Sequence, residues 1–254
     1  MKVILKMEKK NGGFKINFNN KYLLITNFKN DTIEGKGKCF YSNGNVFEGT
    51  LNDNYQPIKG KMKYSNNDEY DGEFENLLRK GNGIMKYVTD EIYDGKWNNN
   101  EKNGKGIFCF NQNDYKKIKN KIQKIQNNIF ELFNFESSIY IGNFKNNKKE
   151  GEGIFYMNKD NNNNDLFNNN IILDGKFNNG HKYGKSKIYF KNKSYFEAYW
   201  INDDKIDDKK GGIFYINDLE YKHDNFQINE WIDFIRRKSY KTIRKNRIDK
   251  TIIR

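Results

Sequence analysis

The 254-residue sequence is poor in cysteine, proline and histidine, and it has no long apolar run. Its two cysteines, Cys39 and Cys109, are too few for a disulfide framework, which favours a reducing compartment. The opening MKVILKMEKK has only a short apolar run between lysines, unlike a signal peptide. No stretch reaches the ~20 apolar residues of a membrane-spanning helix. We therefore expect a soluble, cytoplasmic protein whose contacts with membranes are peripheral.

Aromatic side chains and positive charge are abundant instead. Aromatic residues make up 16% of the chain, so we expect a core that relies on Phe and Tyr rings. The formal net charge is +13, which favours acidic partners: anionic lipid, nucleic acid or an acidic protein surface. Charge alone does not choose among these three.

One short pattern recurs along the chain. Residues 93–110 read YDGKWNNNEKNGKGIFCF, and closely similar segments occupy residues 70–87 and 140–157. The anchor glycines Gly49, Gly72 and Gly95 are spaced by 23 residues, and the register continues through seven units. Insertions of 24 and 10 residues interrupt it after the fourth and fifth units. Such a fixed period is typical of repeat architectures.

Within each unit the side chains alternate with a period of two, which predicts strands. Tyr93, Gly95 and Trp97 share one face, whereas Asp94 and Lys96 point to the other. Turn signals such as YSNGNVF join the strands into a meander of hairpins. Glycines at one level of adjacent strands leave room for neighbouring rings to lie over the backbone.

These residues resemble the MORN (membrane occupation and recognition nexus) family, whose unit is close to Tyr-x-Gly-x-Trp/Phe followed by Gly-x-Gly. The resemblance covers residues 22 to 217, with departures at Thr26, Ile58, Ser186 and Ala198. It implies an all-β fold: an elongated, single-layer antiparallel meander of about seven to eight hairpins. It also implies a grooved face used for protein partners or for association with membranes.

The repeat divides the chain into three parts. Residues 1–21 form a degenerate leading hairpin or cap, residues 22–218 the array, and residues 219–254 a basic helical tail. The array has insertions near 114–137 and 158–170, and the second is an asparagine-rich loop. In the first, apolar residues spaced by 4, 3, 4 and 3 predict an amphipathic helix: Ile118, Ile122, Ile125, Ile129 and Leu132. We expect this helix to pack on the sheet, and the alternative is a helix that binds a partner or a membrane surface.

The sequence predicts no enzyme, cofactor or metal site. GHKYGKS, residues 180–186, has Asn179 where a phosphate-binding loop needs glycine. His181 and His223 have no cysteine nearby, which argues against zinc. The acids that precede the anchor glycines, such as Asp94, face lysines such as Lys96 and predict a structural ladder.

Two surfaces are candidates for binding. The aromatic face is expected to bind a protein partner, either a helix or an extended segment, through Tyr70, Phe74, Tyr93, Trp97, Phe108, Tyr140 and Phe144. The tail is expected to contact anionic lipid or an acidic partner through Arg236, Arg237, Lys238, Lys241, Arg244, Lys245 and Arg247. The alternative is a capping helix whose apolar side packs on the sheet and whose basic side faces solvent.

The first surface indicates a non-catalytic scaffold, and the second a peripheral membrane adaptor. A third hypothesis is an accessory module that acts in trans on an enzyme such as a lipid kinase, because MORN arrays in that family can be joined to catalytic domains. Nucleic-acid binding ranks last, since no binding module for it is visible. A membrane or a cytoskeletal structure is the expected place of attachment within the cytoplasm.

The tail hypothesis predicts binding to anionic membranes that salt weakens. Residues 231–254 hold nine Lys or Arg against Asp233 and Asp249. Each basic residue near an anionic leaflet contributes about 1 kcal/mol, screened over a Debye length of about 8 Å. Co-sedimentation with anionic liposomes should therefore fade as salt rises, unless Trp231, Phe234 and Ile235 insert into the bilayer. Equal binding to neutral and anionic liposomes at low salt would exclude the membrane role.

Overall fold

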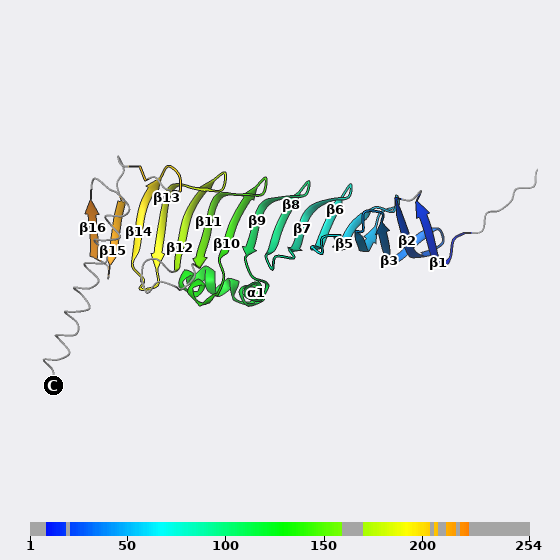
Figure 1. Ribbon diagram of the computed structural model, residues 1–254, viewed down its shortest axis with the longest axis horizontal. Coiled ribbons are helices and arrows are strands. Elements are labelled where there is room, and N and C mark those ends of the chain that lie inside the picture. The colour runs from blue at the N-terminus through cyan, green and yellow to red at the C-terminus, as the bar shows by residue number, and fades with distance from the viewer. Residues whose placement is uncertain are drawn as a thin grey trace, which may run out of the picture.

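One long antiparallel sheet dominates the computed structural model (Figure 1). The structure describes residues 9–18, 21–158, 170–203, 206–207, 212–216 and 219–223. Within them the sheet has 16 strands, and each strand is hydrogen-bonded to its neighbours in the sequence. This arrangement confirms the predicted single-layer meander of about eight hairpins. The predicted C-terminal helix and its seven basic residues lie outside the described residues.

The strands follow one another along the sheet in sequence order. They are β1 (Gly12–Phe18), β2 (Tyr22–Lys29), β3 (Thr32–Tyr41), β4 (Val46–Leu51), β5 (Pro57–Lys63), β6 (Glu69–Glu75), β7 (Leu78–Lys86), β8 (Ile92–Asn98), β9 (Glu101–Cys109), β10 (Ile139–Lys145), β11 (Lys148–Asn158), β12 (Asn170–Asn178), β13 (His181–Phe190), β14 (Tyr195–Trp200), β15 (Gly212–Ile216) and β16 (Leu219–His223). The strand β16 carries the sheet past residue 218, where the sequence places the end of the array. The division into cap, array and tail stays a prediction.

A line of small residues crosses the sheet from β3 to β15. Gly95 of β8 lies opposite Gly83 of β7 and Gly106 of β9, and the pairing continues in both directions. Gly106 is then paired with Gly142 of β10, although the first insertion separates them in the sequence. Ser186 and Ala198 occupy this line farther along. Small residues therefore replace glycine without any change of register.

Tyrosine rings occupy the space that the glycines leave. A Cβ atom placed on Gly106 would lie 2.5 Å from Cε2 of Tyr93, and one on Gly95 would lie 2.6 Å from its Oη. The Tyr93 hydroxyl donates to the Lys96 carbonyl oxygen at 2.9 Å, which holds the ring along its own strand. Tyr70 and Tyr140 make the same contacts with their own glycine pairs. These tyrosine rings together cover the sheet on this face, where a second layer of secondary structure is missing from the described residues.

The first glycine of each Gly-x-Gly has a different role from the second. Gly81 has a φ of 70°, and the register between β6 and β7 shifts between Gly72 and Phe74. This combination is a β-bulge, which glycine accommodates without strain. The hairpins that precede the bulges are closed by two-residue turns with positive φ, such as Asn99 and Asn100. The abundance of asparagine in the turns follows from this geometry.

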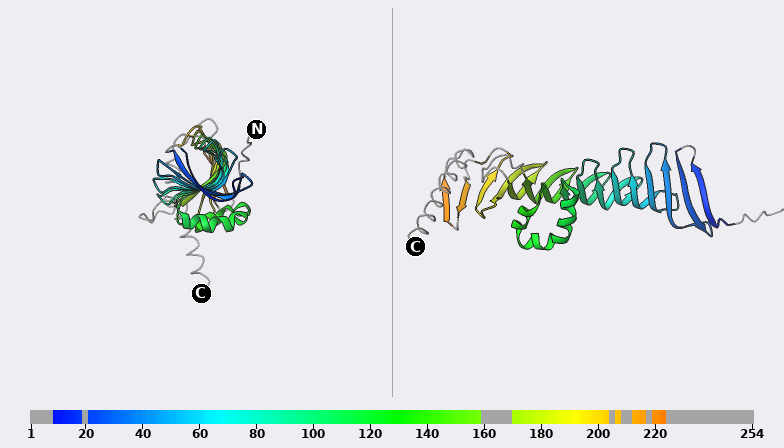
Figure 2. Two further views of the ribbon diagram at one scale, coloured as in Figure 1. Left: turned by 90° about the vertical axis from the view of Figure 1, so that its right-hand side faces the viewer. Right: turned by 60° about the horizontal axis from the view of Figure 1, so that its bottom comes forward.

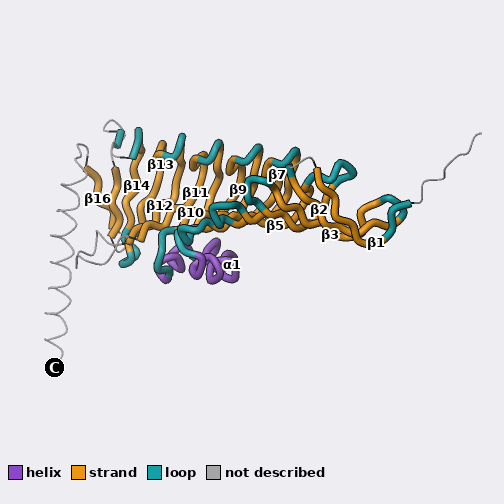
Figure 3. The backbone as a smooth tube through the Cα atoms, turned by 45° about the vertical axis from the view of Figure 1, so that its right-hand side comes forward, coloured by secondary structure: helices purple, strands orange, loops and turns teal. Residues whose placement is uncertain are grey.

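A helix from the first insertion covers part of the opposite face of the sheet (Figures 1 and 2). The helix α1 (Gln112–Asn127) is followed by the 3₁₀ helix η1 (Ile129–Asn134), and both are shown in Figure 3. Buried residues of this segment pack against buried sheet residues: Tyr115, Ile118, Ile125 and Leu132 join Ile92, Cys109, Ile139, Tyr156 and Ile172. The expected packing of the insertion on the sheet is confirmed.

The helix is shorter than its apolar stripe. The stripe predicts one helix through Leu132, but α1 ends at Asn127. Asn128 has an extended backbone with φ −148°, and its side chain accepts from the Phe130 backbone N–H at 3.2 Å. Asn128 therefore starts a new helix, and Ile129 and Leu132 reach the sheet from η1.

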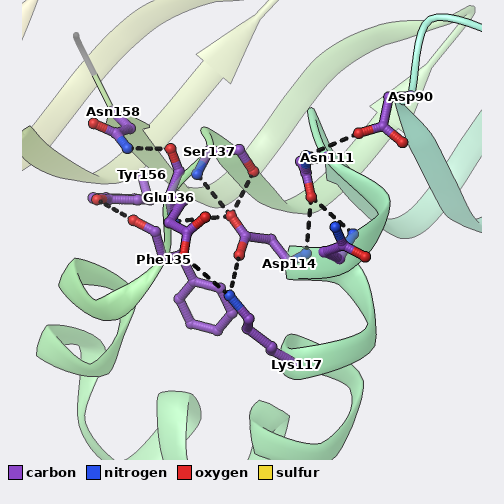
Figure 4. A network of polar contacts seen from close by, with 10 residues as sticks. Asp90, Asn111, Asp114, Lys117, Phe135, Glu136, Ser137, Tyr156 and Asn158 are labelled. Carbon is purple, nitrogen blue, oxygen red and sulfur yellow. Dashed lines mark hydrogen bonds and ion pairs between the residues drawn. The ribbon is translucent and has the colours of Figure 1, made fainter.

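The buried carboxylate of Asp114 holds the two ends of the first insertion together (Figure 4). Asp114, 1% exposed, accepts hydrogen bonds from the backbone N–H groups of Glu136 at 2.9 Å and Ser137 at 2.7 Å. It also accepts from the Ser137 hydroxyl at 2.8 Å and pairs with Lys117 at 3.3 Å. The two ends of the insertion are thereby joined to each other.

Further polar contacts tie the insertion to the sheet. Asn111 caps α1 by accepting from the backbone N–H of Asn113 at 2.8 Å, and it donates to Asp90 at 2.8 Å. The Tyr115 hydroxyl donates to Asp94 at 2.6 Å. Asp94, the acid that precedes the anchor glycine Gly95, thus helps to hold α1 on the sheet. The buried apolar stripe of α1 is thus used within the fold and is not open to a partner or a membrane surface.

The line of small residues across the sheet predicts that Gly106→Ala lowers the stability of the protein. The added methyl group would overlap the Tyr93 ring and displace it, and overpacking of this kind costs about 1–3 kcal/mol. Urea unfolding followed by circular dichroism should show that loss in the free energy of unfolding. Gly13→Ala is the matched control, because the nearest atom to its Cβ is the side-chain Oδ1 of Asn27 at 3.3 Å. Equal stability of the two variants would contradict the role of the line.

Candidate functional site

The seven predicted binding residues lie together on the glycine face, but most of them are buried. Tyr70, Tyr93 and Tyr140 are 0% exposed, and Phe74, Trp97 and Phe144 are at most 6% exposed. Phe108 is half-buried at the edge of this cluster. The rings contact one another edge to face, as in Tyr93 against Phe144 with centroids 5.1 Å apart. Phe108 is thus partly accessible to a partner, whereas the other six rings are buried beneath a further layer of side chains that also reaches Phe108.

That further layer includes a row of cations that the sequence analysis missed. Four half-buried basic residues stand over the rings, and each is the second residue of its strand: Arg79 of β7, Lys102 of β9, Lys149 of β11 and Lys182 of β13. We call them the cation row. A signal was present in the sequence, since Arg79 and Lys102 are one 23-residue period apart.

Each member of the cation row lies over an aromatic ring. The Arg79 guanidinium carbon is 4.5 Å from the Trp97 ring centroid, and Lys102 Nζ is 4.3 Å from that of Phe108. The Lys149 and Lys182 ammonium groups are 3.6 Å from Phe155 and 4.2 Å from Trp200. These are cation–π distances, each worth about 0.5–2 kcal/mol depending on desolvation.

Contacts between repeats hold the row in place. The Arg79 backbone N–H donates to Oδ1 of Asn100 at 2.8 Å, in the turn of the following hairpin. Lys102 donates in the same way to Asn147 at 2.9 Å. The backbone N–H of Lys182 donates to Asp203 at 2.8 Å. The next repeat thus holds the backbone at Arg79, Lys102 and Lys182 in place.

Burial acts against the charge of the lysines. It lowers the pKa of Lys102 to about 8, while Glu91 opposes this shift and Arg79 adds to it. Burial also lowers the pKa of Lys149, and Asp203 opposes it. Among the described residues, no carboxylate forms an ion pair with either ammonium group. Lys102 and Lys149 therefore give the aromatic face positive charge that is partly desolvated and forms no ion pair with a described carboxylate.

The uncovered part of the opposite face has a different character. A cavity of about 560 Å³ lies over β3 to β7, lined by Lys38, Phe40, Val46, Glu48, Lys61, Met62, Lys63, Glu69, Tyr70, Asp71, Ile84 and Lys86. Acids and lysines alternate there, and Lys38 pairs with Glu48 at 3.5 Å. In this predicted ladder four lysines lie beside three acids, so most of its charge is offset within the ladder. It offers less to a charged partner than the cation row does.

The described residues contain no group of three His, Cys, Asp or Glu side chains placed to hold a metal ion. No helix in the described part of the chain is long and apolar enough to cross a membrane. Burial raises the pKa of the Cys39 thiol to about 11 and of the Cys109 thiol to about 12. These thiols are therefore protonated core residues.

The fold and the repeated aromatic face define a β-hairpin repeat protein. The family model for the MORN repeat matches residues 27–46, 70–90, 93–115 and 140–160. These four segments are MORN repeats, as the glycine and aromatic spacing of the chain predicts. The matched segments lie within the array, and the structure adds hairpins on both sides of them.

Comparison with solved structures gives further likenesses. No curated protein matches the sequence. Among solved structures, a similar one is the SAS-4 (dCPAP) TCP domain of Drosophila melanogaster in complex with a proline-rich motif of Ana2 (dSTIL). The identity is 12%, the match covers 83% of this chain and 88% of that one, and the TM-score is 0.39. A likeness at this level does not bear on the partners of this protein.

The lowered pKa of Lys102 predicts a pH-dependent effect of Lys102→Met. Between pH 8 and the ordinary lysine pKa of 10.5, the unfolded chain holds a proton that folded Lys102 has released. The contribution of Lys102 to stability therefore rises with pH in this window. The stability of the variant relative to the wild type should be highest below pH 8 and should fall toward pH 10.

Denaturant unfolding of both proteins from pH 7 to 10 measures this difference and cancels titrations that they share. Lys105→Met is the control, because Lys105 is an exposed lysine of the same strand. A stability difference for Lys102→Met that does not change with pH would contradict the buried charge.

Proposed function

We propose that this protein is a non-catalytic scaffold that binds a protein partner through the aromatic face of its sheet. The MORN repeats matched at four segments of the chain support a repeat scaffold. The observation that carries the proposal is the cation row over the rings, on the face opposite the helix α1. Among the described residues no helix lies over this face (Figures 1 and 2).

The surface offered to a partner has two components. Half-buried rings such as Phe108 and Phe155 supply apolar contact area, and they are continuous with the buried cluster below. Lys102 and Lys149 stand over those two rings and supply charge. Rigid aromatic groups next to charged groups are common anchors in protein interfaces. The surface repeats from β7 to β13, so it suits a partner segment that runs along the sheet.

The other hypotheses depend on residues that the structure does not describe or on the resemblance alone. The basic residues of a peripheral membrane adaptor all lie within residues 224–254. A role beside a lipid kinase has no specific contact in its favour. A cytoplasmic location at a membrane or a cytoskeletal structure remains our proposal for where the scaffold acts.

Affinity capture with full-length variants tests the proposal. Phe108→Ala should reduce the capture of specific partners at least several-fold, because it removes an accessible ring from the aromatic face. Phe40→Ala is the matched control, since Phe40 is 38% exposed and lines the cavity on the opposite face. A chain without residues 224–254 measures the contribution of the tail.

The outcomes separate the hypotheses. Loss of a partner with Phe108→Ala and its retention with Phe40→Ala support the aromatic face, provided that circular dichroism shows a folded sheet in both. Retention with Phe108→Ala places the site elsewhere. Loss only when residues 224–254 are removed favours the tail.

A further inference from the structure

We infer that the aromatic face recognises an acidic, extended polypeptide segment whose carboxylates bind the cation row one by one. This inference rests on the proposed function and adds the chemistry of the partner. The row supplies Arg79, Lys102, Lys149 and Lys182 from four strands that alternate along one sheet: β7, β9, β11 and β13.

The spacing of the row sets the spacing of the acids. Adjacent strands are about 4.8 Å apart, so cations on every second strand are about 9.6 Å apart. An extended chain advances about 3.3 Å per residue and therefore covers about 10 Å in three residues. A segment that runs along the sheet with an acidic residue at every third position matches the row. The first insertion does not disturb this spacing, because Gly106 of β9 pairs directly with Gly142 of β10.

The fold does not require a cation at these positions. Each member of the row lies opposite an aromatic residue of the preceding strand, as Lys102 does opposite Trp97 and Lys149 opposite Phe144. In β3 the same position, opposite Phe28, is occupied by Ile33. Ile33 packs against the buried cluster. An aliphatic side chain can therefore cover the rings at this place.

The charge of the row is instead suited to an acidic ligand. The Lys102 and Lys149 ammonium groups lose hydration over the rings and, within the described residues, gain no carboxylate in exchange. A partner carboxylate would form a charge-assisted hydrogen bond in a partly desolvated site, where such bonds are strongest. The linear arrangement favours a single chain over a planar membrane surface.

Binding of an acidic segment should depend on pH. The aromatic rings of Tyr87, Tyr93 and Phe108 surround the Lys102 ammonium group, and Glu91 and Arg79 are the charged groups that act on it. Deprotonation of Lys102 above pH 8 removes one cation and leaves Arg79 charged. Affinity should therefore decrease between pH 7 and 9 without being abolished.

A synthetic peptide tests the inference with the full-length protein. The probe is a fluorescein-labelled peptide of about 15 residues with Glu at every third position and Ser or Thr between, since three steps of the row span about 29 Å. A peptide with Gln in place of Glu is the uncharged control. Fluorescence anisotropy should show binding of the Glu peptide, and affinity for the Gln peptide should be at least about tenfold lower.

Variants locate the binding on the row. Lys102→Met combined with Lys149→Met should weaken binding of the Glu peptide about tenfold or more, whereas Lys102→Arg keeps the charge and should retain it. The matched control combines Lys105→Met with Lys148→Met, which removes two exposed lysines from the same strands, β9 and β11. Melting curves check that each variant is folded. An equal loss in the control would overturn the inference.

The experiments distinguish a failure of this inference from a failure of the proposed function. If the Glu and Gln peptides bind equally or not at all, while Phe108→Ala still releases the captured partner, the acidic ligand is wrong and the scaffold role stands. If anionic vesicles bind through Lys102 and Lys149 and the peptide does not, the ligand is lipid and the inference is overturned. If Phe108→Ala also has no effect on capture, both are wrong.

Discussion

The close approach of tyrosine rings to the backbone along one line of small residues is the constraint on which the structure depends. A sheet of one layer has no opposing layer to bury its side chains, and its repeats contact only their neighbours. Here Tyr70, Tyr93 and Tyr140 lie flat over pairs of glycines and so bury themselves on their own strands. Any Cβ at those glycines would lift the rings and open the core. The periodic glycine is thus a condition of stability in a sheet that has no partner sheet.

The two faces of the sheet are completed in different ways. On one face the inserted segment α1–η1 brings its own apolar stripe, and Asp114 holds the ends of the insertion together. On the other face the rings pack edge to face and are topped by the stems of long basic side chains. Their charged groups also lie over the rings, as Lys102 Nζ does over Phe108 and Lys149 Nζ over Phe155. The aromatic face is therefore covered by charged side chains and not by a second layer of secondary structure.

The sequence predicted the fold because its signals are local and repeated. The spacing of Gly106 and Gly142 defined the register across an insertion, and the stripe through Ile118 and Ile125 defined the covering helix. Exposure was harder to predict, since a period of two assigns a ring to a face but does not say how deep it lies. Trp97 was expected to meet a partner and is 4% exposed, with its indole N–H bound to the Gly83 carbonyl oxygen at 3.0 Å. The cation row was missed because the chain has 46 Lys and Arg, and because contacts with the next repeat, as at Arg79 and Lys102, are not visible in the sequence.

The position of Ile33 decides how the cations are best understood. If the row served packing alone, an aliphatic residue would cover the rings without loss of hydration, and Ile33 does so in β3. A cation over a ring gains about 0.5–2 kcal/mol, but burial still lowers the pKa of Lys102 to about 8, so the charged form is disfavoured in the free protein. An opposite charge on a partner would stabilise the charged form of Lys102. The same arrangement that costs stability in the unbound scaffold therefore gives it selectivity for an acidic chain.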